Sequence, residues 1–311
     1  MHSRRVLILT NCTNRKRGPI PPHLSARSLP KATYKIVSSE WARRLDEATD
    51  RYIADELYCG RAVTETLQAS HTVSAEVIFL SAGLGVVPQT ERVPAYNLTS
   101  SPRLPDSISA RVSEPYSSAQ WWKELNNARG KRSALGRLIC DREPSLILAA
   151  LPASYLGMVG EEIETLPATI QKNLRIIGPR RAEEVPDSLR SYWLPYDWRL
   201  DSPETGFNGT TADFPHRALR HFVTELPDNA LGFSLGRHQA LVEKTLSQFK
   251  PYVQKRGAPA SDEEVLVVIR RLWNKHDGNR SRILRDLRAH SGIACEQTRF
   301  RRLADRFQGK A

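Results

Sequence analysis

The stretch VLILTNCTNRK, residues 6–16, changes from apolar to polar within a single step. Its first four residues, Val6 to Leu9, form a short run rich in β-branched side chains, which is typical of a buried strand. Two asparagines, a cysteine and a basic cluster follow at once. The sequence therefore predicts a strand that leaves the core here and carries polar side chains at its carboxyl end.

The same pattern recurs along the chain. Three further apolar runs follow: VIFL (77–80), LILAAL (146–151) and LRII (174–177). Long amphipathic stretches lie between them, such as Trp41 to Val63 and Trp121 to Cys140. Strands that alternate with helices predict an α/β domain with a mostly parallel sheet and helices on both faces. We assign this domain to residues 1–254.

Segments rich in proline or glycine interrupt the pattern. Residues 18–30 and 101–106 are dense in proline, which lacks a backbone donor, and are expected to be surface loops. Residues 194–215 are dense in Gly, Pro, Asn, Asp and Thr, a composition that favours turns. Two helices are then expected over 216–226 and 238–249.

The bulk composition limits the compartment and the partners. The 311 residues are 40% hydrophobic and carry a formal charge of +12, with a pI near 9.8, which favours a polyanionic partner. The four cysteines are far apart and match neither a disulfide framework nor a zinc site, so we expect a reducing cytoplasm, no metal and no cofactor. No apolar run approaches the roughly 20 residues of a membrane span, and we expect no membrane partner.

The last fifty residues have their own organisation. Residues 255–261 are interpreted as a linker, after which Ser261 and Glu264 have the spacing of a capping box. Apolar residues at helical spacing follow up to Trp273, and two more helices are expected over 281–289 and 295–307. Three short helices with a glycine turn before the last predict a small all-α, helix-turn-helix-like domain over 262–311.

This domain is strongly basic. Residues 270–311 hold 12 Lys or Arg and 4 Asp or Glu, a net charge of 12 − 4 = +8. The polar side chains away from the apolar face of the last helix can meet phosphates or bases. We therefore predict a DNA or tRNA interface; a solvated helix or a surface for a protein partner are the alternatives. The candidate residues are Arg280, Arg282, Gln297, Thr298, Arg301, Arg302 and Arg306.

Four strand ends offer small, polar or basic side chains. Ligands of open parallel sheets bind outside the carboxyl ends of the strands, so these residues are candidates for the rim of a pocket. No dinucleotide fingerprint or phosphate-binding loop is present. The candidate ligand-binding residues at these ends are Asn11, Asn14, Lys16, Ser81, Gly83, Gly85, Ser154 and Tyr155, with the GPRR segment (178–181) after the fourth run. Arg199, in the irregular segment 194–215, is a further candidate for ligand binding.

Three side chains are candidates for catalysis. Asp197 and Asp201 flank Arg199, and such a carboxylate can act as an acid, a base or a nucleophile, or can stabilise an oxocarbenium-like ribosyl centre. A surface salt-bridge cluster explains the same residues. The Cys12 thiol requires a lowered pKa to act as a nucleophile, and the alternative is a small buried hydrophobe.

Several segments resemble a known family. LTNCTNRK, YCGRAV, VIFLSAGLGVVP and VPAYN are similar, in that order over residues 4–100, to the YaaA-like superfamily. A more distant likeness is to the accessory domain of archaeosine synthases and archaeal tRNA-guanine transglycosylases. Residues 274–303 resemble a C-terminal module of bacterial proteins of this kind, some in anti-phage operons. One context this implies is the transglycosylase-like accessory protein of type IV CBASS operons, which act with other defence proteins.

The resemblance implies a site for a purine or 7-deazapurine-like base and a reaction at an N-glycosidic bond, either cleavage or exchange. Where the family has Pro-Tyr-Asp, this chain has Pro94, Ala95, Tyr96 and Asn97. An amide cannot act as a carboxylate base. Either Tyr96 and Asn97 only orient a ligand, or the chemistry is absent or lies at Asp197 or Asp201. The alternatives to such an enzyme are a noncatalytic DNA-binding or nucleotide-sensing protein and a scaffold.

Overall fold

The computed structural model describes residues 5–102, 104–225, 227, 230–252 and 257–308. The chain divides into two compact units, Met1–Tyr252 and Val253–Ala311. We call them the α/β unit and the C-terminal unit, and each is described by itself. None of the helices in the described ranges combines the length and the apolarity that a bilayer span requires.

The α/β unit is built on a five-stranded sheet in the order β4-β3-β1-β6-β7. All neighbouring pairs are parallel except β3 and β4, which are antiparallel. The expected apolar runs form the four parallel strands, and their side chains are almost wholly buried. The four parallel strands are β1 (Val6–Asn11), β3 (Glu76–Ser81), β6 (Leu146–Ala150) and β7 (Leu174–Ile177), and the antiparallel strand is β4 (Gly85–Pro88).

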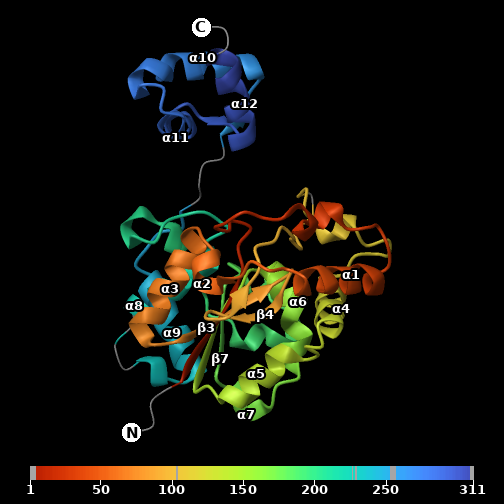
Figure 1. The fold of residues 1–311 in the computed structure, drawn as a ribbon. Helices are drawn as coiled ribbons and strands as arrows, with labels where there is room; N and C mark the ends of the chain where they lie inside the picture. The colour runs from red at the N-terminus through yellow and green to blue at the C-terminus, as the bar shows by residue number, and fades with distance from the viewer. Residues whose placement is uncertain (1–4, 103, 226, 228–229, 253–256, 309–311) are drawn as a thin grey trace. The chain divides into compact units, whose positions relative to one another are not determined.

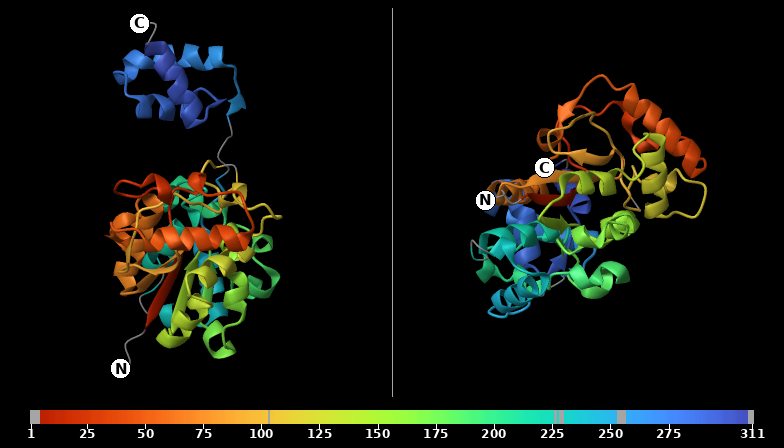
Figure 2. Two further views of the ribbon diagram at one scale, coloured as in Figure 1. Left: turned by 45° about the vertical axis from the view of Figure 1, so that its right-hand side comes forward. Right: turned by 90° about the horizontal axis from the view of Figure 1, so that it is seen from below.

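Helices cover both faces of this sheet (Figures 1 and 2). On one face α3 (Arg61–Val73) packs along α8 (Phe214–Glu225). On the other face α4 (Ser118–Ala128) packs against α6 (Ala153–Glu164), and α1 (Tyr34–Asp46) covers α4. The remaining helices of the unit are α2 (Ala54–Leu57), α5 (Ala134–Arg142), α7 (Ala168–Gln171) and α9 (Leu235–Leu246).

Two of the expected stretches are interrupted, and one short strand was not expected. The stretch 41–63 is not one amphipathic element, because the chain leaves α1 after Asp46, pairs β2 (Tyr52–Ile53) with β5 (Arg92–Val93) and restarts at Gly60 with φ +108°. The stretch 121–140 breaks at Gly130, whose φ is +63°. The unexpected strand is β4, which forms because the chain turns at Gly85 (φ +76°) and pairs back onto β3.

The irregular segments agree better with expectation. Up to residue 213, the segment expected over 194–215 contains only single turns of 3-10 helix, Trp198–Asp201 and Pro203–Thr205, and its last two residues begin α8. The proline-rich loop at 18–30 is irregular as well, but its apolar side chains pack into the core, and Leu24 and Ala26 are almost wholly buried. The loop is thus part of the core of the unit and not only a surface loop.

The C-terminal unit consists of α10 (Asp262–Trp273), α11 (Arg280–His290) and α12 (Gln297–Gln308) around a separate apolar core. The expected capping box of Ser261 and Glu264 is present. The linker expected over 255–261 includes residues 255 and 256, which lie outside the described residues. Its next part is ordered structure: β8 (Ala258–Pro259) pairs in parallel with β9 (Ile293–Ala294).

Candidate functional site

The sheet has a switch point between its two central parallel strands. The chain leaves β1 towards β3 on one side, whereas it leaves β6 towards β7 on the other. The connections after β1 and β6 therefore diverge at the carboxyl edge. In open α/β sheets this divergence is where ligands bind. Cys12 directly follows β1, and Tyr155 lies in the first turn of α6, the helix that follows β6.

Cys12 is the centre of a cluster of phenol groups. Its Sγ lies 3.5 Å from Tyr155 Oη across the switch point, and Tyr96 Oη donates to the same sulfur at 3.5 Å. The Tyr96 hydroxyl lies 2.5 Å from Ser81 Oγ and 3.2 Å from Tyr58 Oη. Burial raises the pKa of Tyr96 and of Tyr155 well above the usual range, so both are neutral phenols. Five side chains from five segments thus share one hydrogen-bonded cluster.

Lys16 covers this cluster on the outer side. Its Nζ lies 4.0 Å from the centre of the Tyr96 ring and donates to the Thr13 carbonyl at 3.1 Å. Burial lowers the pKa of Lys16 from its usual value. A lysine in this state can donate a hydrogen bond to a ligand at a smaller desolvation cost than a fully hydrated one.

Asn11 supplies an acceptor at the end of β1. Its Nδ2 donates to the Cys12 carbonyl at 3.0 Å, while its Oδ1 is buried and has no hydrogen-bond partner in the described part of the chain. Buried polar atoms are rarely left unpaired. The switch point therefore offers a thiol, an amine and an unsatisfied amide oxygen.

Ser81 and the two glycines after it serve the turn that ends β3. Ser81 is fully buried, and its Oγ accepts from the backbone N–H groups of Gly83 and Leu84 at 3.2 and 2.9 Å. A Cβ on Gly83 would lie 2.4 Å from Tyr96 Cε2, so only glycine lets the ring approach. These residues support the cluster from the buried side, and none of them lies on its outer surface.

Other candidates lie apart from the cluster. Asn14 is exposed two residues beyond Cys12, and Ser154 is exposed in the first turn of α6, where Pro152 is the N-cap. Asn97 pairs through its backbone with Leu24 and Ala26 of the proline-rich loop. In the described part of the chain, no hydrogen bond or ion pair joins the side chains of these three residues to Cys12.

Asp197 is held in a salt bridge of its own. Arg199 Nε lies 2.9 and 3.0 Å from the two Asp197 oxygens, and the same guanidinium binds Glu243 at 2.7 and 2.8 Å. Asp197 also caps the 3-10 turn by accepting from the Arg199 N–H. The Asp197 side chain is 29% exposed, so one side of its carboxylate still reaches solvent.

Asp201 is buried between two arginines that sequence reasoning did not place beside it. Arg180, which follows β7, lies 2.6 Å from Asp201 Oδ2, and Arg217 of α8 lies 2.9 Å from Asp201 Oδ1. Arg217 is wholly buried and also binds Asp213 at 2.7 Å. The only sequence signal for this site was a set of charged side chains within a turn-rich segment. That signal does not reveal that the partners of Asp201 lie in other elements of the chain.

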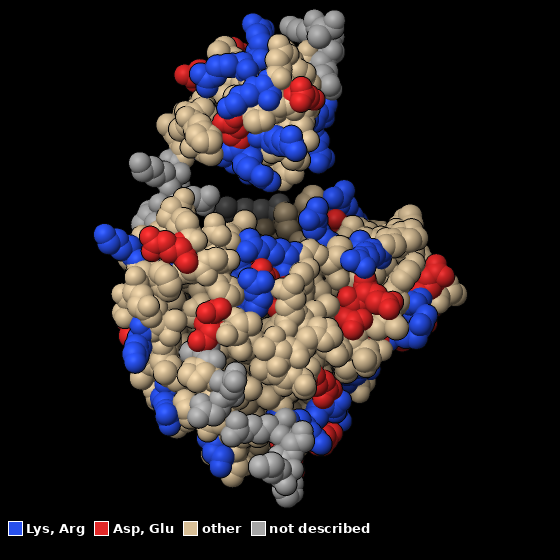
Figure 3. Space-filling model, turned by 90° about the vertical axis from the view of Figure 1, so that its left-hand side faces the viewer, with Lys and Arg blue, Asp and Glu red and all other residues tan. Residues whose placement is uncertain are grey.

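The basic residues of the C-terminal unit gather on its surface. Phe300 and Leu303 of α12 are buried, whereas the expected interface residues Gln297, Thr298, Arg301, Arg302 and Arg306 are exposed. Arg302 binds Asp262, and Arg280 binds Asp305, so part of this charge is used within the unit. Figure 3 shows Lys and Arg over much of the visible face of this unit, with few acidic side chains between them.

Comparison of the chain with protein-family models, with curated proteins and with solved structures found no match. In the described ranges no three His, Cys, Asp or Glu side chains are grouped so that they could hold a metal ion.

Proposed function

We propose that the protein binds nucleic acid through its C-terminal unit and binds a purine or 7-deazapurine-like base at the switch point of its α/β unit. The contact between Cys12 and Tyr155 carries the second half of this proposal, because it joins the two diverging connections at the position where such sheets bind ligands. The unpaired Asn11 oxygen suits a ring or exocyclic N–H donor of a base.

The proposal that the C-terminal unit binds nucleic acid rests on α12. In a helix-turn-helix arrangement the third helix presents its exposed face to the nucleic acid. Arg301 and Arg306 are exposed there and have no ion-pair partner in the described part of the chain. Their charge is free to displace counterions from phosphates.

Fluorescence anisotropy of the full chain with duplex DNA, single-stranded DNA and tRNA tests this interface. The double variant R301A/R306A is expected to bind more weakly and to lower the salt slope by roughly one per lost phosphate contact. R137A is the matched control, since Arg137 is exposed on α5 and its side chain makes no hydrogen bond or ion pair within the described residues. Equal affinity of R301A/R306A and the wild type would refute the assignment of this face.

Calorimetry with guanine and 7-deazaguanine tests the switch point. Y155F and K16M each remove one polar group from the cluster and are expected to weaken base binding, with nucleic-acid binding unchanged. Y116F is the control, because Tyr116 Oη makes no hydrogen bond in the described structure. If neither base binds the wild-type protein, the proposed ligand class is wrong.

A reaction at the N-glycosidic bond of such a base is the second candidate, with Asp197 as its carboxylate, because it is more exposed than Asp201. Base release from nucleosides, tRNA or DNA is then expected in the wild type and lost in D197N. Binding without any base release would instead indicate a noncatalytic sensor, in keeping with the arginine that neutralises Asp197. A role in anti-phage defence follows only from the family resemblance.

A further inference from the structure

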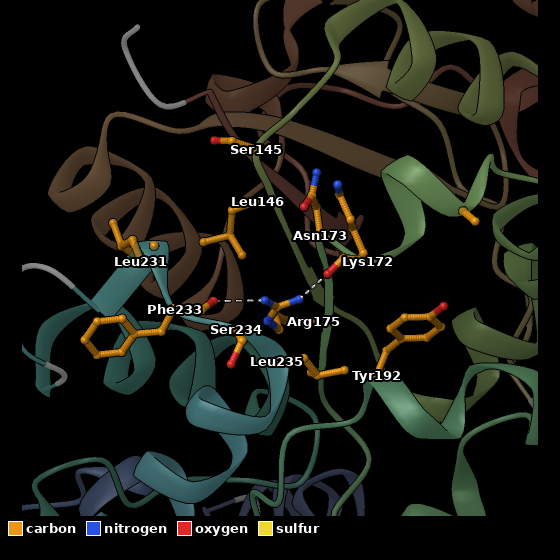
Figure 4. Close-up of a pocket in the computed structure, with 12 residues that line it drawn as sticks. Ser145, Leu146, Lys172, Asn173, Arg175, Tyr192, Leu231, Phe233, Ser234 and Leu235 are labelled. Atoms are coloured by element: carbon orange, nitrogen blue, oxygen red, sulfur yellow. Dashed lines mark hydrogen bonds between the residues drawn. The ribbon is translucent and has the colours of Figure 1, made fainter. Parts of the chain in front are cut away.

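A cleft of about 720 Å³ opens at the edge of the sheet opposite to the switch point (Figure 4). Ser145 and Asn173 line it, each directly before a strand, and so mark the amino ends of β6 and β7. The segment that leads into α9, residues 231–235, lines another side. The volume is within the range of sites that hold small organic ligands.

A buried cation lies in this cleft. Arg175, on β7, is only 4% exposed. It donates to the carbonyls of Lys172, Leu174 and Phe233 at 2.9, 2.7 and 3.2 Å and to His238 Nδ1 at 2.8 Å. None of these acceptors carries a negative charge, and no carboxylate of the described residues forms an ion pair with it. Burial of this kind disfavours the charged form, and it lowers the pKa of Arg175 to about 10.

The hydrogen bonds of His238 show that it does not balance this charge. A guanidinium only donates, so His238 Nδ1 must be the unprotonated nitrogen of the ring. Its Nε2 then carries the proton and donates to the Ala230 carbonyl at 2.6 Å. The imidazole is therefore neutral, and burial lowers its pKa. The positive charge of Arg175 is left without a counter-ion.

Two further features make the cleft positive. The amino end of α9 lies there, with Ser234 as its N-cap, and the N–H groups of Leu235 and Gly236 have no partner in the described part of the chain. A helix of 12 residues presents a partial positive charge at this end. Lys172 adds an exposed ammonium group to the lining.

We propose that this cleft binds a small organic phosphate of nucleotide size, with its phosphoryl group between Arg175, Lys172 and the first turn of α9. Three positive groups of different kinds suit a tetrahedral oxyanion better than a planar carboxylate. The rest of the cleft, against Tyr192 and Leu231, has room for the organic part. This site is separate from the switch point and does not depend on the function proposed for it.

Calorimetry of the full chain at low salt, with AMP and with inorganic phosphate as probes, tests the proposal. AMP is expected to bind more tightly than phosphate. The variant K172E should weaken AMP binding by about tenfold, because a nearby charge is reversed. K35E is the matched control: Lys35 is exposed on α1 and its side chain has no hydrogen bond or ion pair with any described residue, so its reversal should leave affinity within about twofold.

A second variant, R175Q, is expected to abolish AMP binding, with folding checked by near-ultraviolet circular dichroism. If R175Q does not fold, K172E against K35E still decides. The proposal is overturned if AMP does not bind the wild type, if AMP binds no more tightly than inorganic phosphate, or if K172E and K35E weaken binding equally.

Discussion

The sulfur of Cys12 lies 3.5 Å from the phenol oxygen of Tyr155, although 143 positions separate them in the chain. The contact exists because β1 and β6 are neighbours in the sheet while their following connections leave in opposite directions. Neither residue alone marks a site. Together with Tyr96 they form a polar cluster beside the apolar core of the unit.

The phenol of Tyr96 should contribute measurably to stability. Y96F removes a hydroxyl that contacts Ser81, Tyr58 and Cys12, and leaves the first two with fewer partners in the core. A cost of about 1–3 kcal/mol in the free energy of unfolding is expected from urea titrations. Y116F is the control and should change stability by less than about 0.5 kcal/mol, because the Tyr116 hydroxyl is buried without a partner. Equal effects would contradict the importance of the cluster.

Asp201 should be essential for the fold. D201A removes one of the carboxylates that bind the wholly buried Arg217, and it also removes the ion-pair partner of Arg180. Removing one partner of a buried ion pair costs about 3–5 kcal/mol, which thermal or urea unfolding would detect. D187A serves as the control, since Asp187 binds Arg190 at the surface and should cost less than about 1 kcal/mol. A loss in D201A no larger than in D187A would mean that the network is not coupled.

Two buried histidines predict a dependence of stability on pH. Burial lowers the pKa of His216 and of His221 to about 4. The unfolded chain takes up these protons as the pH falls through about 6.5, whereas the folded protein does not until about pH 4. Stability is therefore complete above pH 6.5 and falls below it, by roughly 2 kcal/mol per histidine at pH 5.

The variant H216M tests this prediction. Urea titrations between pH 7 and pH 5 should show a smaller loss of stability than in the wild type, because one of the two titrating groups is gone. H71M should keep the wild-type slope, since His71 is exposed on α3. An unchanged slope in H216M would show that His216 is protonated normally in the folded protein.

The capping box should control the start of α10. S261A removes the oxygen that accepts from the Glu264 N–H, and should cost about 1 kcal/mol locally. Amide hydrogen exchange over residues 262–266 of the full chain should become faster by roughly fivefold. S281A is the control, because Ser281 lies within the first turn of α11 and its side chain makes no hydrogen bond in the part of the chain that the structure describes. Faster exchange in both variants alike would exclude a specific role of the cap.

The regular elements followed from local patterns in the sequence. Four apolar runs became the four parallel strands, and the capping box began a helix at the expected residue. The stretch 41–63 could not be divided in advance, because a tertiary pairing between Tyr52 and Val93 breaks it. The amphipathic spacing of the sequence continues through this break, so the spacing does not indicate where the helix ends.

The site was only partly predictable, for a related reason. The position of Cys12 and Tyr155 followed from the rule that parallel strands end at one edge. The partners of Asp201 did not, because Arg180 and Arg217 reach it from separate elements. Tyr58 was also missed, since its role depends on a hydroxyl contact with a tyrosine 38 residues away.

The pairing of β8 with β9 determines where the C-terminal unit can be cut. Ala258 N donates to the Gly292 carbonyl at 2.6 Å, and Arg299 of α12 donates to the Ala260 carbonyl at 2.7 Å. A fragment that began at Asp262 would lack the Ala258 N–H and the Ala260 carbonyl. It would therefore lose the two hydrogen bonds that join this segment to Gly292 and to Arg299. Proteolysis between positions 257 and 261 should accordingly release a looser, faster-exchanging product than cleavage a few residues earlier.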